Sequence, residues 1–228
     1  MPTLYHHPLS APSRYVRLVL AEYGEEVTLS EVNPLARDET LLALNPSGSL
    51  PVLADDNEAV IAEAAVIAEY LAETRGVRFG EDSLMPDTAV ERAEARRLVI
   101  WFGQKMHAEV TRLLVNELVF KRLPGSKGAS PDSTAIRAGR TNIRYHIRYI
   151  NYLAERRHWL AGRRLSLADL AAAAEISCLD YMGEVPWDEG EAAKAWYARI
   201  KSRLSFRPIL ADRIKGAIPA PHYTDPDF

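Results

Sequence analysis

The first eighty residues alternate short apolar runs with helical patterns, and this alternation limits the fold more than any other feature of the chain. Runs of alternating or apolar residues predict strands at 3–7, 26–32, 52–55 and 59–61. Apolar residues at helical spacing predict helices at 14–24, 36–44 and 63–76. The resulting order, βαβαββα, joins a parallel half to an antiparallel half. We therefore expect a small α/β domain at the start of the chain.

From Asp87 onward every long pattern has the helical period. The apolar positions of the first such helix recur at a spacing of four, at Leu98, Phe102, Met106, Val110, Leu114 and Leu118. Further helices are predicted up to about residue 157, near 167–182 and near 190–204. No periodic pattern crosses the Gly-, acid- and Pro-containing segment 76–86. We expect a thioredoxin-like domain over 1–78 and an all-helical domain with an extended C-terminal tail over 86–228.

Composition excludes several classes of protein. The 228 residues are 47% apolar, which is enough for buried cores, and the net charge of −3 provides no global field that would attract nucleic acid. The single Cys178 cannot form an internal disulfide, and the six histidines show no metal-ligand spacing. The N-terminus lacks a signal-peptide pattern, and no apolar run approaches the roughly 18 residues of a membrane span. We expect a cytoplasmic protein with no metal, no nucleic-acid partner and no membrane insertion.

Leu50-Pro51-Val52 lies where a loop enters a strand. In the βαβαββα order the X-Pro bond at this place is commonly cis, which turns the backbone N–H and C=O of Leu50 toward a cleft where they can pair with an extended peptide. The alternative is an ordinary trans turn proline. The position of Pro51 within the βαβαββα order favours the cis bond.

Two serines precede the first helix, and each has two interpretations. A hydroxyl here can cap the helix, or it can donate to a thiolate held at the positive helix N-terminus. Ser13, next to the helical pattern, is the better candidate for the cap, and Ser10 on the loop is the better candidate for the donor.

Glu63-Ala64 begins the last helix of the small domain. The free N–H groups at the start of this helix would bind a carboxylate of a ligand. The alternative is simply an acidic first turn.

Two features of the helical half are interpreted as structural. Ser166 and Asp169 have the spacing of a capping box, with Leu165 and Leu170 as its hydrophobic staple. Four arginines three or four residues apart share one helix face, at Arg137, Arg140, Arg144 and Arg148. A solvated face paired with nearby acids is favoured over an acid-binding stripe.

The chain resembles the glutathione transferase superfamily over essentially its whole length, and three motifs in the expected order carry the resemblance. HPLSAPSRYVRLVLAEYG resembles the active-site loop of serine-type members, NPSGSLPVL the cis-proline segment, and SLADLAAA the capping-box helix. The resemblance implies the glutathione-transferase fold, with Ser10 as the thiol-activating hydroxyl and Leu50, before Pro51, as the backbone partner of the glutathione cysteine. It also implies that Glu63 and its successor clamp the γ-glutamyl group. Ala64 departs from the usual Ser or Thr, and losing a hydroxyl bond to a charged group costs about 1.5–3 kcal/mol, which is roughly tenfold or more in affinity.

Residues 144–213 and the ending PAPHYTDPDF resemble a subgroup of FtsZ-localised, transferase-like bacterial cell-division proteins. That resemblance implies a homodimeric, non-enzymatic adaptor for FtsZ filaments at the division site that needs no cofactor. The Pro-stiffened tail would offer Tyr223 and Phe228 as apolar anchors beside Asp225 and Asp227. The alternative for the tail is a strap lying across its own domain. The alternative function is a serine-type transferase in which Ser10 activates glutathione, the cosubstrate, toward a small electrophile.

Overall fold

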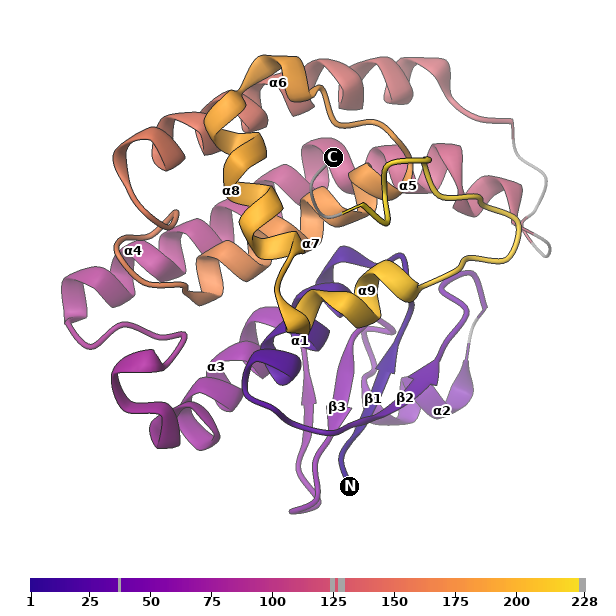
Figure 1. Ribbon diagram of the computed structural model, residues 1–228. Coiled ribbons are helices and arrows are strands. Elements are labelled where there is room, and N and C mark those ends of the chain that lie inside the picture. Colours follow the sequence, from indigo (N-terminus) through magenta and orange to yellow (C-terminus); the bar gives the residue numbers. More distant parts are fainter. Residues whose placement is uncertain (37, 124–125, 127–129, 226–228) are drawn as a thin grey trace.

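The computed structural model describes residues 1–36, 38–123, 126 and 130–225, and its first part is a four-stranded mixed sheet with three helices (Figure 1). The strands, in the sheet order β2-β1-β3-β4, are β1 (Thr3–His6), β2 (Thr28–Glu31), β3 (Val52–Ala54) and β4 (Val60–Ala62). The helices are α1 (Ala11–Glu22), α2 (Glu39–Leu44) and α3 (Ala64–Thr74). Strand β1 pairs with β2 in parallel, and the other pairs are antiparallel. The predicted thioredoxin-like order is confirmed.

The remaining part of the described chain is helical. Its helices are α4 (Ala89–Ile100), a π-helical segment (Trp101–Thr111), α5 (Arg112–Leu118), α6 (Ser133–Arg156), α7 (Leu167–Tyr181), α8 (Glu191–Lys201) and α9 (Arg207–Ala211). Short 3₁₀ segments lie at Gly76–Asp82, Phe120–Arg122, Trp187–Glu189 and Leu204–Phe206. Every residue of α7 is buried, so this helix forms the centre of the helical half. The sequence patterns did not predict α9, which is too short for a helical period and has Pro208 in its first turn.

The spacing of four in the first long helix has a structural cause that the pattern alone did not reveal. In an α-helix of 3.6 residues per turn, positions four apart drift by about 40° per step, so a long row would leave the core. The wider turns of the π-helical segment counteract this drift. Phe102, Met106 and Val110 within it and Leu114 beyond it are all fully buried.

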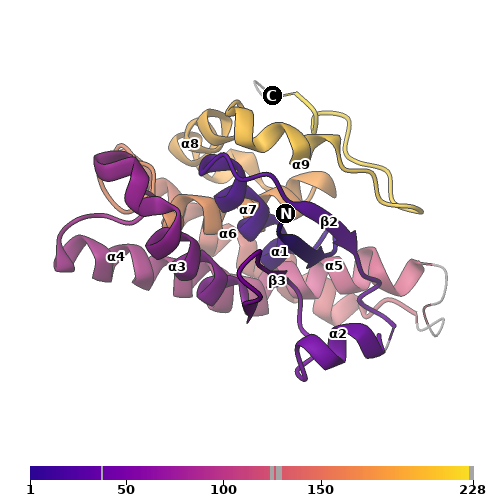
Figure 2. The same cartoon turned by 90° about the horizontal axis from the view of Figure 1, so that it is seen from below.

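One continuous apolar core joins the two halves. Its residues include Leu4, Leu18 and Leu53 from the sheet half and Ile147 and Leu170 from the helical half. Helix α9 lies beside α1 in both ribbon views (Figures 1 and 2), and the Arg17 guanidinium donates to both carboxylate oxygens of Asp212, at 2.7 and 3.0 Å. The domain limits 1–78 and 86–228 stay predictions.

The capping box is present where the sequence predicts it. Asp169 Oδ2 accepts from the Ser166 N–H at 3.1 Å and the Ser166 hydroxyl at 2.9 Å. Its Oδ1 accepts from the Leu160 N–H at 2.7 Å and the Trp196 indole at 3.0 Å. The fully buried carboxylate therefore joins the start of α7 to α8 and to the segment before α7.

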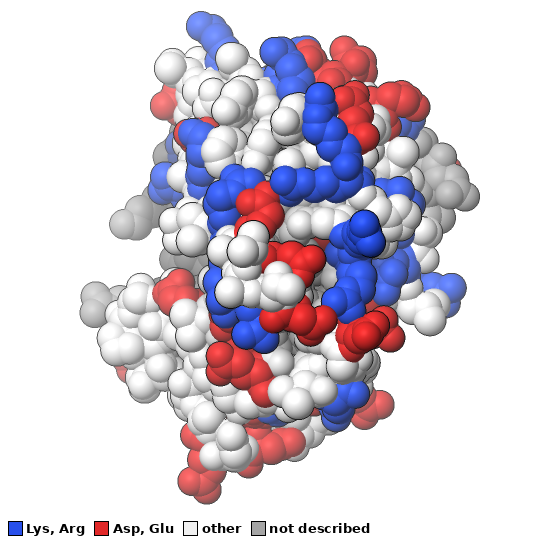
Figure 3. Space-filling model, turned by 90° about the vertical axis from the view of Figure 1, so that its left-hand side faces the viewer, with Lys and Arg blue, Asp and Glu red and all other residues white. Residues whose placement is uncertain are grey.

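Three of the four arginines on α6 are paired with acids, as the favoured interpretation predicts. Arg140 makes two bonds to Glu184, and Arg144 and Arg148 both bind Glu189. Arg137 has no ion-pair partner among the described residues. Basic and acidic side chains are also intermixed on the side of the molecule that carries α4, where Figure 3 shows no single-sign field.

The described part of the chain contains neither a helix that could span a membrane nor a cluster of metal-binding side chains. None of its helices combines the length and apolar character that a bilayer span needs. The same residues contain no group of three His, Cys, Asp or Glu side chains arranged around a metal site. Cys178 is buried and burial raises the pKa of its thiol to about 12, although Arg14 lies close enough to oppose that shift.

Candidate binding cleft between the two halves

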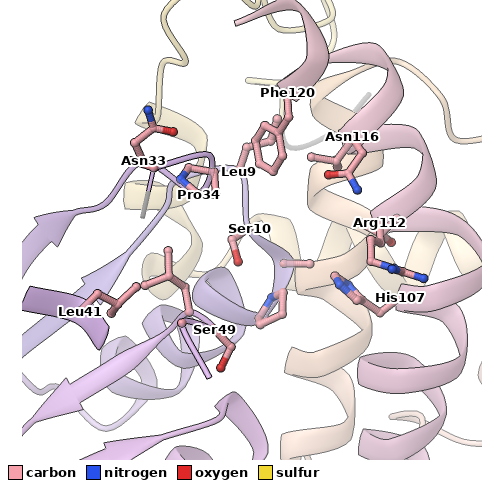
Figure 4. A pocket seen from close by; sticks show the side chains of 17 residues that line it. Leu9, Ser10, Asn33, Pro34, Leu41, Ser49, His107, Arg112, Asn116 and Phe120 are labelled. Carbon is pink, nitrogen blue, oxygen red and sulfur yellow. The ribbon is translucent and has the colours of Figure 1, made fainter. Parts of the chain in front are cut away.

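A cavity of about 260 Å³ opens between the sheet half and the helical half (Figure 4). The sheet side contributes loops around Ser10, Asn33 and Ser49, and the helical side contributes His107 and Arg112. A second cavity of about 480 Å³ adjoins the first, and the residues that line both are Pro12, Ser49, Leu50 and His107. Small ligands usually bind in cavities, and such cavities often lie where two parts of a fold meet.

The Leu50-Pro51 bond is cis, as the chain order predicts. Leu50 lines both cavities, and its backbone forms no hydrogen bond with any other described residue. Its N–H and C=O therefore remain available for an extended peptide ligand.

The prediction for the two serines was wrong about the cap. Helix α1 begins at Ala11, and Ser10 is its N-cap: the Ser10 hydroxyl accepts from the Ser13 N–H at 3.4 Å. Pro12 fits the first turn because its missing N–H would have no partner there, so the helix starts three residues earlier than the apolar pattern. Ser13 is buried, and its hydroxyl instead accepts from the His7 N–H at 3.3 Å. Ser10 lines the cleft, and Figure 4 shows its hydroxyl pointing into it.

Glu63 and Ala64 lie at the start of α3 on the second cavity. Glu63 has a positive φ of 71°, which is uncommon for a non-glycine residue. Its carboxylate accepts from the Ser49 hydroxyl at 2.6 Å and does not cap the helix. The first N–H groups of α3 are therefore left without a side-chain cap, and Ala64 supplies no hydroxyl. The fold thus brings Ser10, Leu50, Glu63 and Ala64 to the two adjoining cavities, whereas Pro51 follows Leu50 and lines neither of them.

The helical wall contains polar residues that the sequence analysis did not single out. His107 Nδ1 lies 3.1 and 3.2 Å from the two carboxylate oxygens of Glu175, which is only 2% exposed. Burial would lower the pKa of His107, but the charge of Glu175 and its hydrogen bond outweigh burial and raise it. Arg112 and Asn116 are exposed on the same wall. No local motif marks these residues, because their proximity depends on the packing of α7 against the π-helical segment.

The tail does not present its predicted anchors as a free segment. Tyr223 is fully buried, and its hydroxyl donates to the Ile209 carbonyl at 2.9 Å while its ring contacts Tyr181 edge-on. Up to Tyr223 the tail therefore lies as a strap across its own domain. The Tyr223 side chain has no exposed face left for a partner. Asp225 is exposed, and Asp227 and Phe228 lie outside the described residues.

Comparison with known proteins agrees with the fold. The family models described as Glutathione S-transferase, N-terminal domain and C-terminal domain match residues 9–74 and 130–203. FtsZ-localized protein A from Caulobacter vibrioides is 46% identical over 229 residues, which cover 99% of this chain and 98% of that protein.

Two solved structures extend the likeness to the whole fold. A glutathione S-transferase from Sinorhizobium meliloti 1021 is 51% identical with a TM-score of 0.96, and each chain is covered completely. FzlA from C. crescentus is 46% identical with a TM-score of 0.92, covering 100% of this chain and 99% of that one. The chain therefore belongs to the glutathione transferase superfamily and, within it, to the family of FtsZ-localized protein A.

Proposed function

We propose that this protein acts in cell division as a non-enzymatic adaptor that binds FtsZ filaments as a homodimer at the division site. The observation that carries the proposal is the 46% identity to FtsZ-localized protein A along nearly the whole length of both chains. That relative's name records that it localises with FtsZ. Two copies of a modest binding site would gain avidity on a repeating filament, so each single contact can be weak.

Two features of the cleft support a role other than catalysis. Ala64 provides no hydroxyl where a γ-glutamyl carboxylate would bind, and the Glu63 carboxylate is already held by Ser49. Each feature weakens the case for tight glutathione binding while leaving the fold intact.

A homodimer is supported by apolar side chains that are exposed on neighbouring elements. Val66 on α3 and Ile100 on α4 are both 54% exposed and line the same cavity. Light scattering should give twice the 25.5 kDa mass of one chain, and Val66→Glu should shift the protein toward monomer. A monomeric mass for the unaltered protein would contradict the dimer.

Filament binding is tested by co-sedimentation with FtsZ polymers. The variant ends at Tyr223, because this keeps the buried ring and removes only 224–228, including Asp225, Asp227 and Phe228. We expect the full chain to pellet with polymer and the shortened chain to pellet several-fold less. Equal pelleting would remove the tail from the proposal, and no pelleting of either form would remove the adaptor function itself.

A working glutathione transferase is the second candidate, favoured by the cis Leu50-Pro51 bond and the cleft-facing Ser10. In that reaction the Ser10 hydroxyl would donate to the glutathione thiolate, which attacks an electrophile held by the helical wall. Calorimetry with glutathione is the test. Micromolar binding together with a thiolate absorbance that is lost in Ser10→Ala would support this candidate, and no binding at millimolar glutathione would end it.

A further inference from the structure

A cavity of about 460 Å³ lies where four separate segments of the chain meet. They are the end of α1 at Glu22-Tyr23, the segment 79–84 between the two halves (the linker), the turn 158–165 and Arg203 after α8. The described residues that line it include none that line either cavity of the cleft. The linker and the turn both lie on the left-hand side of Figure 1, which faces the viewer in Figure 3. Neither the cleft nor the adaptor function accounts for this cavity.

The turn wall of the cavity is held in one shape by hydrogen bonds. Trp159 and Gly162 exchange two backbone bonds, at 2.9 and 3.0 Å. Between them, the Leu160 N–H donates to the fully buried Asp169 carboxylate at 2.7 Å. Trp159 and Arg163, which line the cavity, are therefore presented by a backbone that needs little reordering when a ligand binds.

The linker wall is fastened to the same part of the helical half. The Leu167 N–H donates to the Leu84 carbonyl at 3.0 Å. Arg164 donates to the Glu81 carbonyl and, at 2.9 Å, to Oδ2 of Asp87. These bonds keep the linker wall and the turn wall at a fixed separation.

Aromatic rings supply most of the apolar lining. Phe79 on the linker packs against Tyr23, with the ring centroids 5.2 Å apart, and both residues line the cavity. Trp159 lines it from the turn, and the Arg199 guanidinium lies 5.2 Å from the centre of the indole ring. Phe79 and Trp159 are only partly buried, so each ring keeps area that a ligand can cover. A flat aromatic group matches this lining, because aromatic pairs gain affinity beyond their buried area.

The charged lining residues leave one cation and one anion without partners. Arg203 makes two bonds to Glu22, at 2.6 and 2.8 Å, and Arg164 is held by the linker as described above. Arg163 on the turn and Asp82 on the linker are exposed, and their side chains have no hydrogen-bond or ion-pair partner among the residues that the structure describes. One unpaired charge of each sign, from two different walls, matches a ligand that itself carries one charge of each sign.

We propose that this cavity binds a free aromatic amino acid. Arg163 binds its carboxylate, Asp82 binds its ammonium group, and the rings of Phe79 and Trp159 contact its aromatic side chain. The site requires neither glutathione nor FtsZ. It goes beyond the adaptor function and does not depend on it.

The test is calorimetry of the full-length protein at pH 7 with four probes. L-Phenylalanine carries both charges and a ring, 3-phenylpropionate lacks the ammonium group, phenethylamine lacks the carboxylate, and L-alanine lacks the ring. We expect L-phenylalanine to bind at least tenfold more tightly than either single-charge probe, because a hydrogen bond to a charged group contributes about tenfold or more in affinity. L-Alanine should not bind detectably. A single-charge probe that binds as tightly as L-phenylalanine would overturn the proposal, as would no binding of L-phenylalanine at millimolar concentration.

Two variants assign each ligand charge to its residue. Arg163→Gln should weaken L-phenylalanine binding about tenfold and leave phenethylamine binding unchanged, since that probe has no carboxylate. Asp82→Asn should weaken L-phenylalanine binding by a similar factor and leave 3-phenylpropionate binding unchanged. Arg137→Gln and Asp188→Asn are the matched controls: each removes an exposed charge that does not line the cavity, so both should bind like the unaltered protein. Thermal unfolding verifies that each variant is folded.

The same variants separate this proposal from the adaptor function. Unchanged L-phenylalanine binding in either folded variant, Arg163→Gln or Asp82→Asn, would overturn the proposed site. Co-sedimentation of Arg163→Gln with FtsZ polymers is a separate readout, which we expect to match that of the unaltered protein. Failure of one measurement thus carries no consequence for the other.

Discussion

The ammonium of Lys201 lies 3.1 Å from Oδ2 of Asp180, and both side chains are fully buried. The same carboxylate accepts from the Tyr197 hydroxyl at 3.2 Å and lies 3.0 Å from His222 Nε2. Lys201 also donates to the His222 backbone carbonyl at 3.3 Å. This buried pair therefore binds the C-terminal segment next to Tyr223 and holds it against α7 and α8.

Replacing one member of the buried pair should be strongly destabilising. Lys201→Met leaves the Asp180 charge without its buried ammonium partner, and we expect a loss of about 3–5 kcal/mol in the free energy of unfolding measured with urea. Lys215→Met, at an exposed lysine, should stay within about 0.5 kcal/mol. A loss below about 1 kcal/mol in Lys201→Met would mean that Tyr197 and His222 alone satisfy Asp180.

The strap should contribute to stability through Tyr223. Tyr223→Ala removes a fully buried ring, for which we expect a loss of about 3–5 kcal/mol. Tyr223→Phe removes only the bond to the Ile209 carbonyl and should cost about 1 kcal/mol, whereas Thr224→Ala, at the exposed neighbouring residue, should have little effect. Urea unfolding of the three variants provides the comparison. Equal stability of Tyr223→Ala and the unaltered protein would show that the strap is not docked in solution.

Ser10 should behave as a helix cap, whatever its chemistry toward a thiol. Ser10→Ala should lower the free energy of unfolding by about 1 kcal/mol, because the Ser13 N–H loses its acceptor. Ser10→Asp should retain the stability of the unaltered protein, since Asp is also a favoured N-cap residue. Thermal unfolding curves of the two variants measure this difference. Identical curves for Ser10→Ala and Ser10→Asp would contradict the cap.

Two buried histidines at the end of β1 should make stability depend on pH. Burial, together with the positive charges of Arg17 and Arg14, lowers the pKa values of His6 and His7 to about 4, against an opposing effect of Asp212. Between about pH 6.5 and pH 4 the unfolded chain binds more protons than the folded one, so stability falls as the pH falls. Above pH 6.5 the contribution is fully present.

The expected size is about 2 kcal/mol for each histidine between pH 7.5 and pH 5. Urea unfolding at the two pH values measures the difference, and His7→Gln should reduce it by about half. His7 Nδ1 accepts from the Leu9 N–H at 3.1 Å, so its protonation also breaks a contact beside Ser10. His158→Gln, at an exposed histidine, is the control and should keep the pH dependence of the unaltered protein. An unchanged pH dependence in His7→Gln would contradict the prediction.

Much of the fold could be predicted because its signals are local. Apolar alternation located the four strands, and the capping box at Ser166 and Asp169 marked the start of α7 to the residue. Both depend on neighbours within a few positions. The start of α1 was misplaced by three residues because the apolar period begins after the helix does, while Pro12 and the Ser10 cap define the true start.

The sequence by itself determined the order of elements, the cis-proline loop and the family. Only the tertiary structure decided what surrounds each candidate side chain: Tyr223 is buried in its own domain, and His107 contacts Glu175 and lines one cavity with Arg112. The physical reason is range. Caps and periods act over one or two turns of chain, whereas burial and charge pairing depend on residues as far apart as His107 and Glu175, which only packing brings together.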